Sequence, residues 1–465
     1  MSVDTTREDQ HTELTRRNFS GFAVVILLAT SVQVGFGAVD LAMIAPLGVD
    51  YVAAVGLADL IVMGLTAYTT GLVHVFASRL AIAEGEHSAS QRLPVLAGAF
   101  VLCSLVFQAV AVGVALSMSW MLHLARQDAD LIPLAVDYIS VRLFGILVAV
   151  MWAAAAEALR ICNMKNLSLK ILVFGFAGNA LLDYLFLYTG ASTIFSSPAQ
   201  AVALATMIVY TLMAVYGILA FVRQFQHREG RLSKTAWKPV VTEFRSMVWV
   251  SHGVGIRHLN DYMAAIIPFI FIGSLGSGVL AAASVGAKIY TMFCRVPQAC
   301  VAGTTVFYSY QVGKEASPGQ LRSHGRRLLA YTAVPTAAAA VLTIALSPWL
   351  VQLFGGTKDL DVRLAVMMLL AFMLTIPLYV LEATYTAILT VHQRGTLLSA
   401  ISTAATYGLT IPLAWVSVFI WRSAFWAIAL SGAASATLIV ILLARALYRD
   451  HWPRQVPQTL ATGRV

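Results

Sequence analysis

The chain has 465 residues, of which 59% are hydrophobic and only 11% are charged, and its mean hydropathy is +0.78. About a quarter of the residues of an ordinary soluble domain are charged, so the composition excludes that class and predicts a polytopic membrane protein. The formal net charge is +9. Because the basic residues lie in loops on one predicted side of the membrane, topology accounts for this charge and we expect no nucleic-acid partner.

Twelve apolar runs are long enough to cross a hydrocarbon core of about 30 Å. They cover residues 19–46, 52–80, 93–124, 131–159, 167–188, 199–225, 247–275, 279–312, 328–354, 362–391, 397–420 and 424–447. The even-numbered connections carry most of the lysines and arginines, which places both termini and the long middle loop in the cytoplasm. We expect a multi-pass protein of the cell membrane, with the bacterial cytoplasmic membrane as its location.

An internal repeat relates the two halves of the chain. Leu47-Gly48 followed by Ala53-Ala54 corresponds to Leu275-Gly276 followed by Ala281-Ala282, 228 residues later. Six crossings return the chain to the same side, so the repeat predicts an all-α membrane protein with two six-helix bundles related by a pseudo-two-fold axis along the membrane normal and a cavity between them. The predicted parts are a cytoplasmic tail (1–18), an N-lobe (19–226), a basic linker (227–246), a C-lobe (247–448) and a second cytoplasmic tail (449–465).

A single carboxylate, Asp40, lies near the outer end of the first span. Even lenient insertion scales give about 2.5 to 3.5 kcal/mol for such a charge at a helix centre, so Asp40 should face a protein interior or a water-filled cavity. We expect it to bind a coupling cation, Na⁺ or H⁺. The alternative is a structural hydrogen bond at a helix break before Pro46, where the span can also bend.

The fifth predicted span contains Asn179 and Asp183. Residues four apart share a helix face, so an amide oxygen and a carboxylate point the same way, which suits a small hard cation or a proton. The alternative is that Asp183 lies near the outer helix end and is simply solvated.

The second half carries more charge inside its spans than packing alone requires. Arg257 and Asp261 are four residues apart in the seventh span, Lys288 lies in the eighth and Glu382 in the tenth. Such a density indicates a hydrated cavity. For Arg257 and Asp261 a neutralised structural pair is an equal alternative, because pairing lowers the cost of two charges in a membrane.

No nucleotide-binding or catalytic signature accompanies these residues. The sequence lacks the P-loop pattern, the H-E-x-x-H pattern and paired metal-binding cysteines. We therefore expect no enzymatic activity and no cofactor, and an ion gradient or the substrate's own gradient as the source of energy.

Taken together, the segment from Asp40 through Leu47-Gly48 to Ala53-Ala54, with its counterpart from Leu275-Gly276 to Ala281-Ala282, resembles the multidrug and toxic compound extrusion (MATE) transporters of the prokaryotic type. The resemblance extends over the twelve spans and the midpoint linker. It implies an N-lobe cation site made by Asp40, Asn179 and Asp183, which would be the Na⁺ ligands if the protein is sodium-coupled, with Thr206 of the sixth span completing the site.

The resemblance is less complete in the C-lobe. The family's acid in the seventh span falls on Asp261, but Tyr379 stands where some members have an aspartate in the tenth span, with Glu382 one turn further on. Arg257 and Lys288 also depart from the family pattern. The position 228 residues after Asp40 is Pro268, so we expect ion coupling mainly in the N-lobe.

The resemblance implies a secondary antiporter that exports organic, often cationic, drugs or toxic metabolites in exchange for Na⁺ or H⁺. The expected partners are small organic substrates and the lipid bilayer, and the expected state is a monomer. Two alternatives stay open: a flippase for lipid-linked precursors of the same superfamily, and a dedicated exporter of an endogenous natural product.

Overall fold

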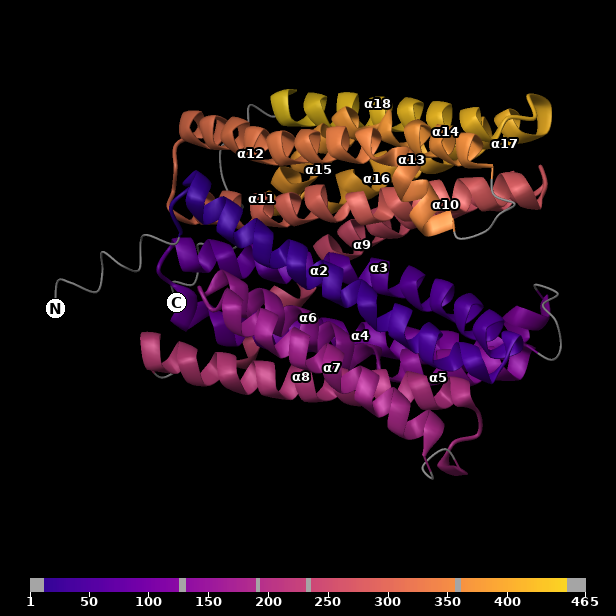
Figure 1. Ribbon diagram of the computed structural model, residues 1–465. Helices are drawn as coiled ribbons and strands as arrows, with labels where there is room; N and C mark the ends of the chain where they lie inside the picture. Colours follow the sequence, from indigo (N-terminus) through magenta and orange to yellow (C-terminus); the bar gives the residue numbers. More distant parts are fainter. Residues whose placement is uncertain (1–11, 125–130, 190–192, 231–235, 356–360, 450–465) are drawn as a thin grey trace. The chain divides into compact units, whose positions relative to one another are not determined.

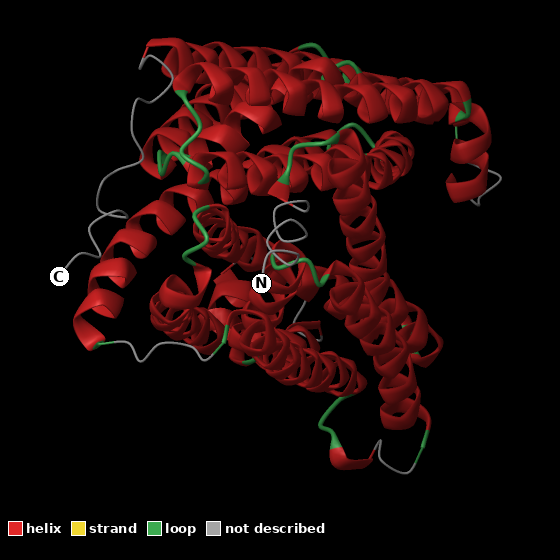
Figure 2. Cartoon of the chain, turned by 90° about the vertical axis from the view of Figure 1, so that its left-hand side faces the viewer, coloured by secondary structure: helices red, strands yellow, loops and turns green. Residues whose placement is uncertain are grey.

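A computed structural model describes the chain apart from residues 1–11, 125–130, 190–192, 231–235, 356–360 and 450–465. Most of the two predicted tails and part of the basic linker therefore lie outside the described residues. Throughout the described part the chain forms helices joined by loops, without a strand (Figure 2). The predicted all-α fold class is confirmed.

The helices divide into two compact units, Leu28–Gly255 (the N-unit) and Met1–Leu27 with Ile256–Val465 (the C-unit). Two helices contribute to both units: α2 begins in the C-unit and ends in the N-unit, and α9 does the reverse. The division thus falls inside the first and seventh predicted spans, and not in the linker between the predicted lobes.

The N-unit is a bundle of long helices (Figure 1). Its elements are the second part of α2 (Arg16–Ile44), η1 (Ala45–Leu47), α3 (Val49–Gly85), α4 (Ala89–Leu124), α5 (Leu131–Phe144), α6 (Ile146–Ile161), α7 (Lys165–Tyr188), α8 (Pro198–Glu229) and the first part of α9 (Trp237–Gly273). Within it, α8 packs against α5, α6 and α7.

The C-unit has shorter and more interrupted helices. It comprises α10 (Ser277–Phe293), α11 (Arg295–Gly313), α12 (Pro318–Ala345), α13 (Ser347–Gly355), α14 (Val362–Met373), α15 (Ile376–Val391), α16 (Gly395–Ala405), η3 (Thr406–Thr410), α17 (Ile411–Trp415), η4 (Val416–Ile420) and α18 (Ala424–Arg449), with the remaining parts of α2 and α9. Here α18 packs against α14 and α15 (Figure 1).

Ten helical segments among the described residues are long and apolar enough to cross a membrane, and the bent pair α5 and α6 raises this to eleven. The protein is therefore a multi-pass membrane protein. The seventh predicted span is not among them although α9 has 37 residues. Its middle carries Arg257, His258, Asn260 and Asp261, which lower its hydropathy.

The backbone repeats its unusual conformations at the spacing of the sequence repeat. Gly48 and Gly276 both have positive φ angles, 147° and 118°, directly before α3 and α10. His87 after α3 and Glu315 after α11 are also 228 residues apart and have φ angles of 55° and 53°. The larger φ angles of Gly48 and Gly276 favour glycine, so the Leu-Gly pairs of the repeat mark equivalent helix starts.

The fourth predicted span is broken at Gly145, where α5 and α6 meet at an angle of 47°. The break frees backbone groups that lipid cannot satisfy. The side chain of Gln108 on α4 bonds to both of them: it donates to the Leu143 carbonyl at 3.0 Å and accepts from the Leu147 amide at 2.9 Å. By contrast, α2 ends at Ile44, so Pro46 lies in the short helix η1 after the span and not at a bend within it.

Candidate functional site

Four polar side chains from three helices of the N-unit meet near the end of α2. The Asn179 amide nitrogen on α7 donates to Asp40 Oδ1 on α2 and to Asp183 Oδ2 on α7, both at 2.9 Å. The Thr206 hydroxyl on α8 donates to Asp40 Oδ2 at 3.1 Å. The structure thus brings together the four residues expected for the N-lobe cation site.

Burial makes this cluster costly unless it is compensated. Asp40 is 1% exposed, and Asn179, Asp183 and Thr206 are fully buried. The alternative of a merely solvated Asp183 is therefore wrong. Two buried acceptor atoms, Asn179 Oδ1 and Asp183 Oδ1, have no hydrogen-bond partner. Buried polar atoms are rarely left unpaired, so these two oxygens indicate room for a cation or a proton donor.

The chemistry of the four side chains suits a hard ligand. All the available donor atoms are oxygens, two carboxylates, an amide carbonyl and a hydroxyl, which is the set that small hard cations prefer. A carboxylate pair held together by one amide can also share a proton. The residues therefore fit Na⁺ or H⁺ as a transported ion.

The C-unit gathers the other predicted residues around an arginine. On α9, Arg257 bonds to Glu382 of α15 at 2.9 Å and forms an ion pair with Asp261 at 3.4 Å. The side chains of Arg257 and Glu382 are 9% and 11% exposed, whereas that of Asp261 is 42% exposed. A neutralised structural pair, the alternative for Arg257 and Asp261, matches this geometry and extends to Glu382.

Two further C-lobe candidates lie outside this ion-pair group. Tyr379 is partly buried on α15, one turn before Glu382. Lys288 is exposed on α10 and has no ion-pair partner among the described residues. The structure therefore joins Arg257, Asp261 and Glu382 but leaves Lys288 apart.

One charged residue of the N-unit was not predicted from the sequence. Arg142 lies in the last turn of α5, beside the break at Gly145, and its guanidinium lies 5.7 Å from the centre of the Tyr138 ring. Its charge acts on the carboxylates of Asp40 and Asp59. The sequence feature that could have indicated Arg142 is its position as an arginine in the middle of the apolar run 131–159.

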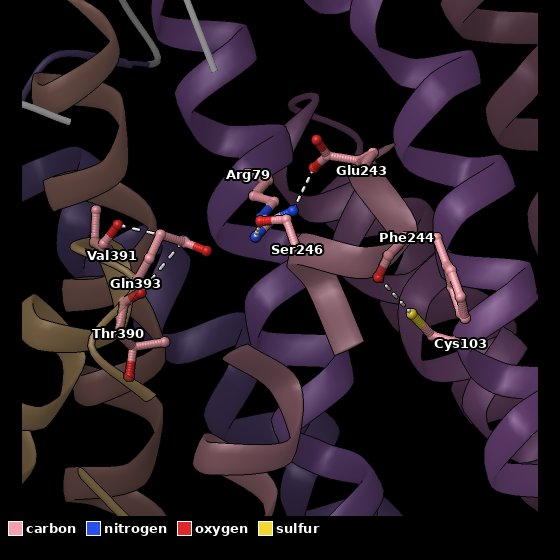
Figure 3. A network of polar contacts seen from close by, with 8 residues as sticks. All are labelled: Arg79, Cys103, Glu243, Phe244, Ser246, Thr390, Val391 and Gln393. Carbon is pink, nitrogen blue, oxygen red and sulfur yellow. Dashed lines mark hydrogen bonds and ion pairs between the residues drawn. The ribbon is translucent and has the colours of Figure 1, made fainter. Parts of the chain in front are cut away.

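A second buried polar network joins α9 to α3 and α4 within the N-unit (Figure 3). Arg79 on α3 forms an ion pair with Glu243 and donates to the Ser246 hydroxyl at 2.9 Å. The Cys103 thiol lies 4.0 Å from the Phe244 carbonyl oxygen. The first part of α9 is thereby held on the N-unit by a charged contact as well as by packing.

At the end of α15, outside the membrane-spanning segments, His392 Nε2 lies 3.0 Å from the Tyr308 hydroxyl, and the buried Nδ1 atom has no hydrogen-bond partner. Burial, and secondarily the positive charge of Arg394, lowers the pKa of His392 to about 4. The imidazole is therefore neutral near pH 7, and this contact is structural.

Comparison with known proteins extends the description. The MatE family model matches residues 26–185 and 258–416. The multidrug resistance protein NorM of Vibrio vulnificus strain YJ016 is 22% identical over 343 residues, covering 72% of this chain and 73% of the relative. A probable multidrug resistance protein NorM of Synechococcus is 21% identical over 66% of each chain.

Solved structures share the fold. A crystal structure of a MATE protein in the bent conformation superposes with a TM-score of 0.80 at 16% identity, covering 98% of this chain and 99% of that chain. A MOP superfamily transporter from Pyrococcus furiosus, described as having a binding pocket of reverse polarity, gives a TM-score of 0.75 at 15% identity, covering 94% and 97%. At these identities the likeness concerns the fold alone.

Proposed function

The chain belongs to the MatE family, and from this premise we propose that it is a secondary antiporter that exports small organic compounds in exchange for Na⁺ or H⁺. Family membership agrees with the resemblance read from the sequence. The names of the NorM relatives, multidrug resistance proteins, support drugs or toxic metabolites as substrates.

One observation carries the proposal: Asp40, Asn179, Asp183 and Thr206 are buried together, and two of their acceptor oxygens lack partners. A carboxylate pair inside a membrane is expensive, so such residues are usually retained for transport of ions or protons. We assign this cluster as the site where the driving cation binds.

In this proposal the cation changes the balance of forces among α2, α7 and α8. With the cation bound, one of the two negative charges of Asp40 and Asp183 is neutralised, so the repulsion between the carboxylates is offset and the three helices can pack closely. Without it, the two carboxylates repel one another and only Asn179 holds them together. Transport is coupled if the drug favours the arrangement that the cation disfavours, since a ligand with equal affinity for both states drives nothing.

The C-unit acids have a different role in this account. Arg257 already supplies the positive charge that Glu382 and Asp261 need. A cation entering there would have to displace a guanidinium held in two contacts, so we place the driving-ion site in the N-unit. We further propose that the protein is a monomer in the bacterial cytoplasmic membrane, with both termini in the cytoplasm.

The test is substrate transport by the purified protein in proteoliposomes under Na⁺ and pH gradients imposed separately. A fluorescent organic cation serves as the probe. The proposal predicts transport that requires one of the two gradients and stops in Asp40→Asn. Transport that needs neither gradient, or that is unchanged in Asp40→Asn, would contradict it.

A further inference from the structure

The position of Arg142 beside the candidate ion site follows from the break in the fourth span. Arg142 is three residues before Gly145, and a Cβ built on Gly145 would lie 2.3 Å from Met207 Sδ on α8. Met207 directly follows Thr206, the residue that donates to Asp40. The end of α5 therefore packs against the part of α8 that belongs to the cluster.

Arg142 lacks a direct acid partner. Within the part of the chain that the structure describes, Arg142 forms no ion pair, and its Nε is buried without a hydrogen-bond partner. Its guanidinium makes a cation–π contact with the Tyr138 ring, 5.7 Å from the ring centre. Arg142 is only partly exposed, so a cation–π contact and the negative end of the α5 dipole offset part of the cost of removing its charge from water. Negative charges nearby stabilise it further.

The negative charges that interact with Arg142 are the carboxylates of Asp40 on α2 and Asp59 on α3, and Asp183 on α7 in turn interacts with Asp40. The hydroxyls of Tyr138 on α5 and Tyr210 on α8 are uncharged near neutral pH. The helix α4 contributes the neutral side chain of Gln108 at the break.

Asp59 stands apart from the hydrogen-bonded cluster. Its Oδ2 lies 3.8 Å from the Cβ position of Gly37, three residues before Asp40 on α2. Asp59 thus faces α2 beside the site, and makes no hydrogen bond with Asp40, Asn179 or Asp183. The surroundings of the cluster thus include the carboxylates of Asp40, Asp183 and Asp59 and the guanidinium of Arg142, and Asn179 joins only Asp40 and Asp183.

We propose that Arg142 and Asp59 form a built-in charge pair, acting through space, that sets how tightly the Asp40 cluster holds the driving cation. This inference rests on the proposed function. Arg142 lowers the affinity of the cluster for a cation so that the ion is released in every cycle, and Asp59 partly offsets that effect. Arg142 is a positioning residue, since it acts on the ion through the field at Asp40.

The test measures the cation concentration that gives half-maximal transport in proteoliposomes, with the same fluorescent organic cation as probe. Arg142→Gln should lower that concentration about tenfold, because it removes a positive charge that opposes cation binding at Asp40 where the effective dielectric constant is about 20. Asp59→Asn should raise it by a similar factor. The double variant Asp59→Asn/Arg142→Gln should return close to the wild-type value.

Two controls separate this charge effect from a loss of structure. Arg142→Lys keeps the charge and should keep the wild-type half-saturating concentration. Arg160→Gln removes an arginine that is paired with Glu157 at 2.5 Å and has no member of the cluster among its partners, and it should leave the value within about twofold.

The outcomes distinguish this inference from the proposed function. If the wild type is driven by a cation and Asp40→Asn is not, but Arg142→Gln leaves the half-saturating concentration unchanged, the role of Arg142 is wrong and the proposed function stands. A double variant that resembles Arg142→Gln alone would overturn the pairing with Asp59. A wild type without cation dependence would overturn the proposed function and this inference together.

Discussion

The two units solve the problem of buried carboxylates in opposite ways. In the N-unit, Asp40 and Asp183 share one neutral amide and leave two oxygens unpartnered. In the C-unit, Glu382 and Asp261 converge on Arg257, a permanent cation. In the N-unit the carboxylates of Asp40 and Asp183 have no positively charged partner within hydrogen-bond distance among the described residues, whereas in the C-unit the guanidinium of Arg257 already balances the charge of the carboxylates. In the proposed account, two acids in one unit form an ion site only where no arginine already pairs with them.

The largest expected effect comes from the amide of the N-unit. Asn179→Leu removes two hydrogen bonds to carboxylates, each worth about 1.5 to 3 kcal/mol, and should reduce cation-driven transport at least about a hundredfold. Asn260→Leu is the matched control in the C-unit, since the Asn260 amide donates to the Ser402 and Thr403 hydroxyls at 2.9 Å and forms no hydrogen bond with an acid among the described residues. Initial transport rates in proteoliposomes measure both. Equal losses in the two variants would remove the contrast between the units.

The next effect concerns stability in the C-unit. Arg257→Gln leaves Glu382 buried without its cation, which should cost about 3 kcal/mol and lower the Tm in detergent by several degrees. The double variant Arg257→Met/Glu382→Leu replaces the pair with apolar groups of similar size and should recover most of that loss. It should also keep its cation dependence. A single variant that unfolds at the wild-type temperature would show that the pair does not stabilise the fold.

A smaller effect identifies the ion. Thr206→Val keeps the shape of α8 but removes the hydroxyl that donates to Asp40. If the ion is Na⁺, the site loses a ligand oxygen and the half-saturating concentration should rise about tenfold. If it is H⁺, Asp40 loses a donor that favours its ionised form, and the protein should reach half-maximal transport at a lower proton concentration. An unchanged value would place Thr206 outside the site.

The smallest effect lies at the end of α15. Burial lowers the pKa of His392 from 6.5 to about 4, so between these values the unfolded state binds a proton that the folded state does not. The stability contributed by neutral His392 is present above about pH 6.5 and is lost as the pH falls towards 4. His392→Phe should therefore show a decrease in Tm between pH 7 and pH 4.5 that is about 1 to 3 °C smaller than in the wild type.

Thermal unfolding in detergent at several pH values measures this difference. Transport in His392→Phe should keep its cation dependence, because the contact with Tyr308 belongs to the C-unit and to no predicted ion site. If the curves of Tm against pH were parallel for the wild type and His392→Phe, His392 would bind a proton equally in the folded and unfolded states, which would contradict the lowered pKa.

The sequence predicts the parts of the site that follow a local rule. Asn179 and Asp183 are four residues apart, so their common face follows from helix geometry, and a carboxylate in an apolar span marks Asp40. Thr206 came only from the family resemblance, because the distance between α7 and α8 along the chain does not fix their register. The structure supplies that register through the contact of Thr206 with Asp40.

Other features depend on contacts between distant segments of the chain and could not be predicted from the sequence. The break at Gly145 is stabilised by Gln108, 37 residues earlier, and glycines are common in membrane helices without such a break. Arg142 gains its setting from that break. The division of α2 and α9 between two units also depends on tertiary packing, since each is one continuous helix in the sequence pattern.

The most direct test of the account compares Asp40→Asn with Glu382→Gln in the same proteoliposome assay under an imposed gradient of the driving cation. Each variant removes one buried carboxylate charge and keeps the side-chain shape. The account predicts that Asp40→Asn abolishes cation-driven transport, whereas Glu382→Gln retains both transport and its cation dependence. Loss of coupling in Glu382→Gln with coupling intact in Asp40→Asn would contradict the assignment of the driving-ion site to the N-unit.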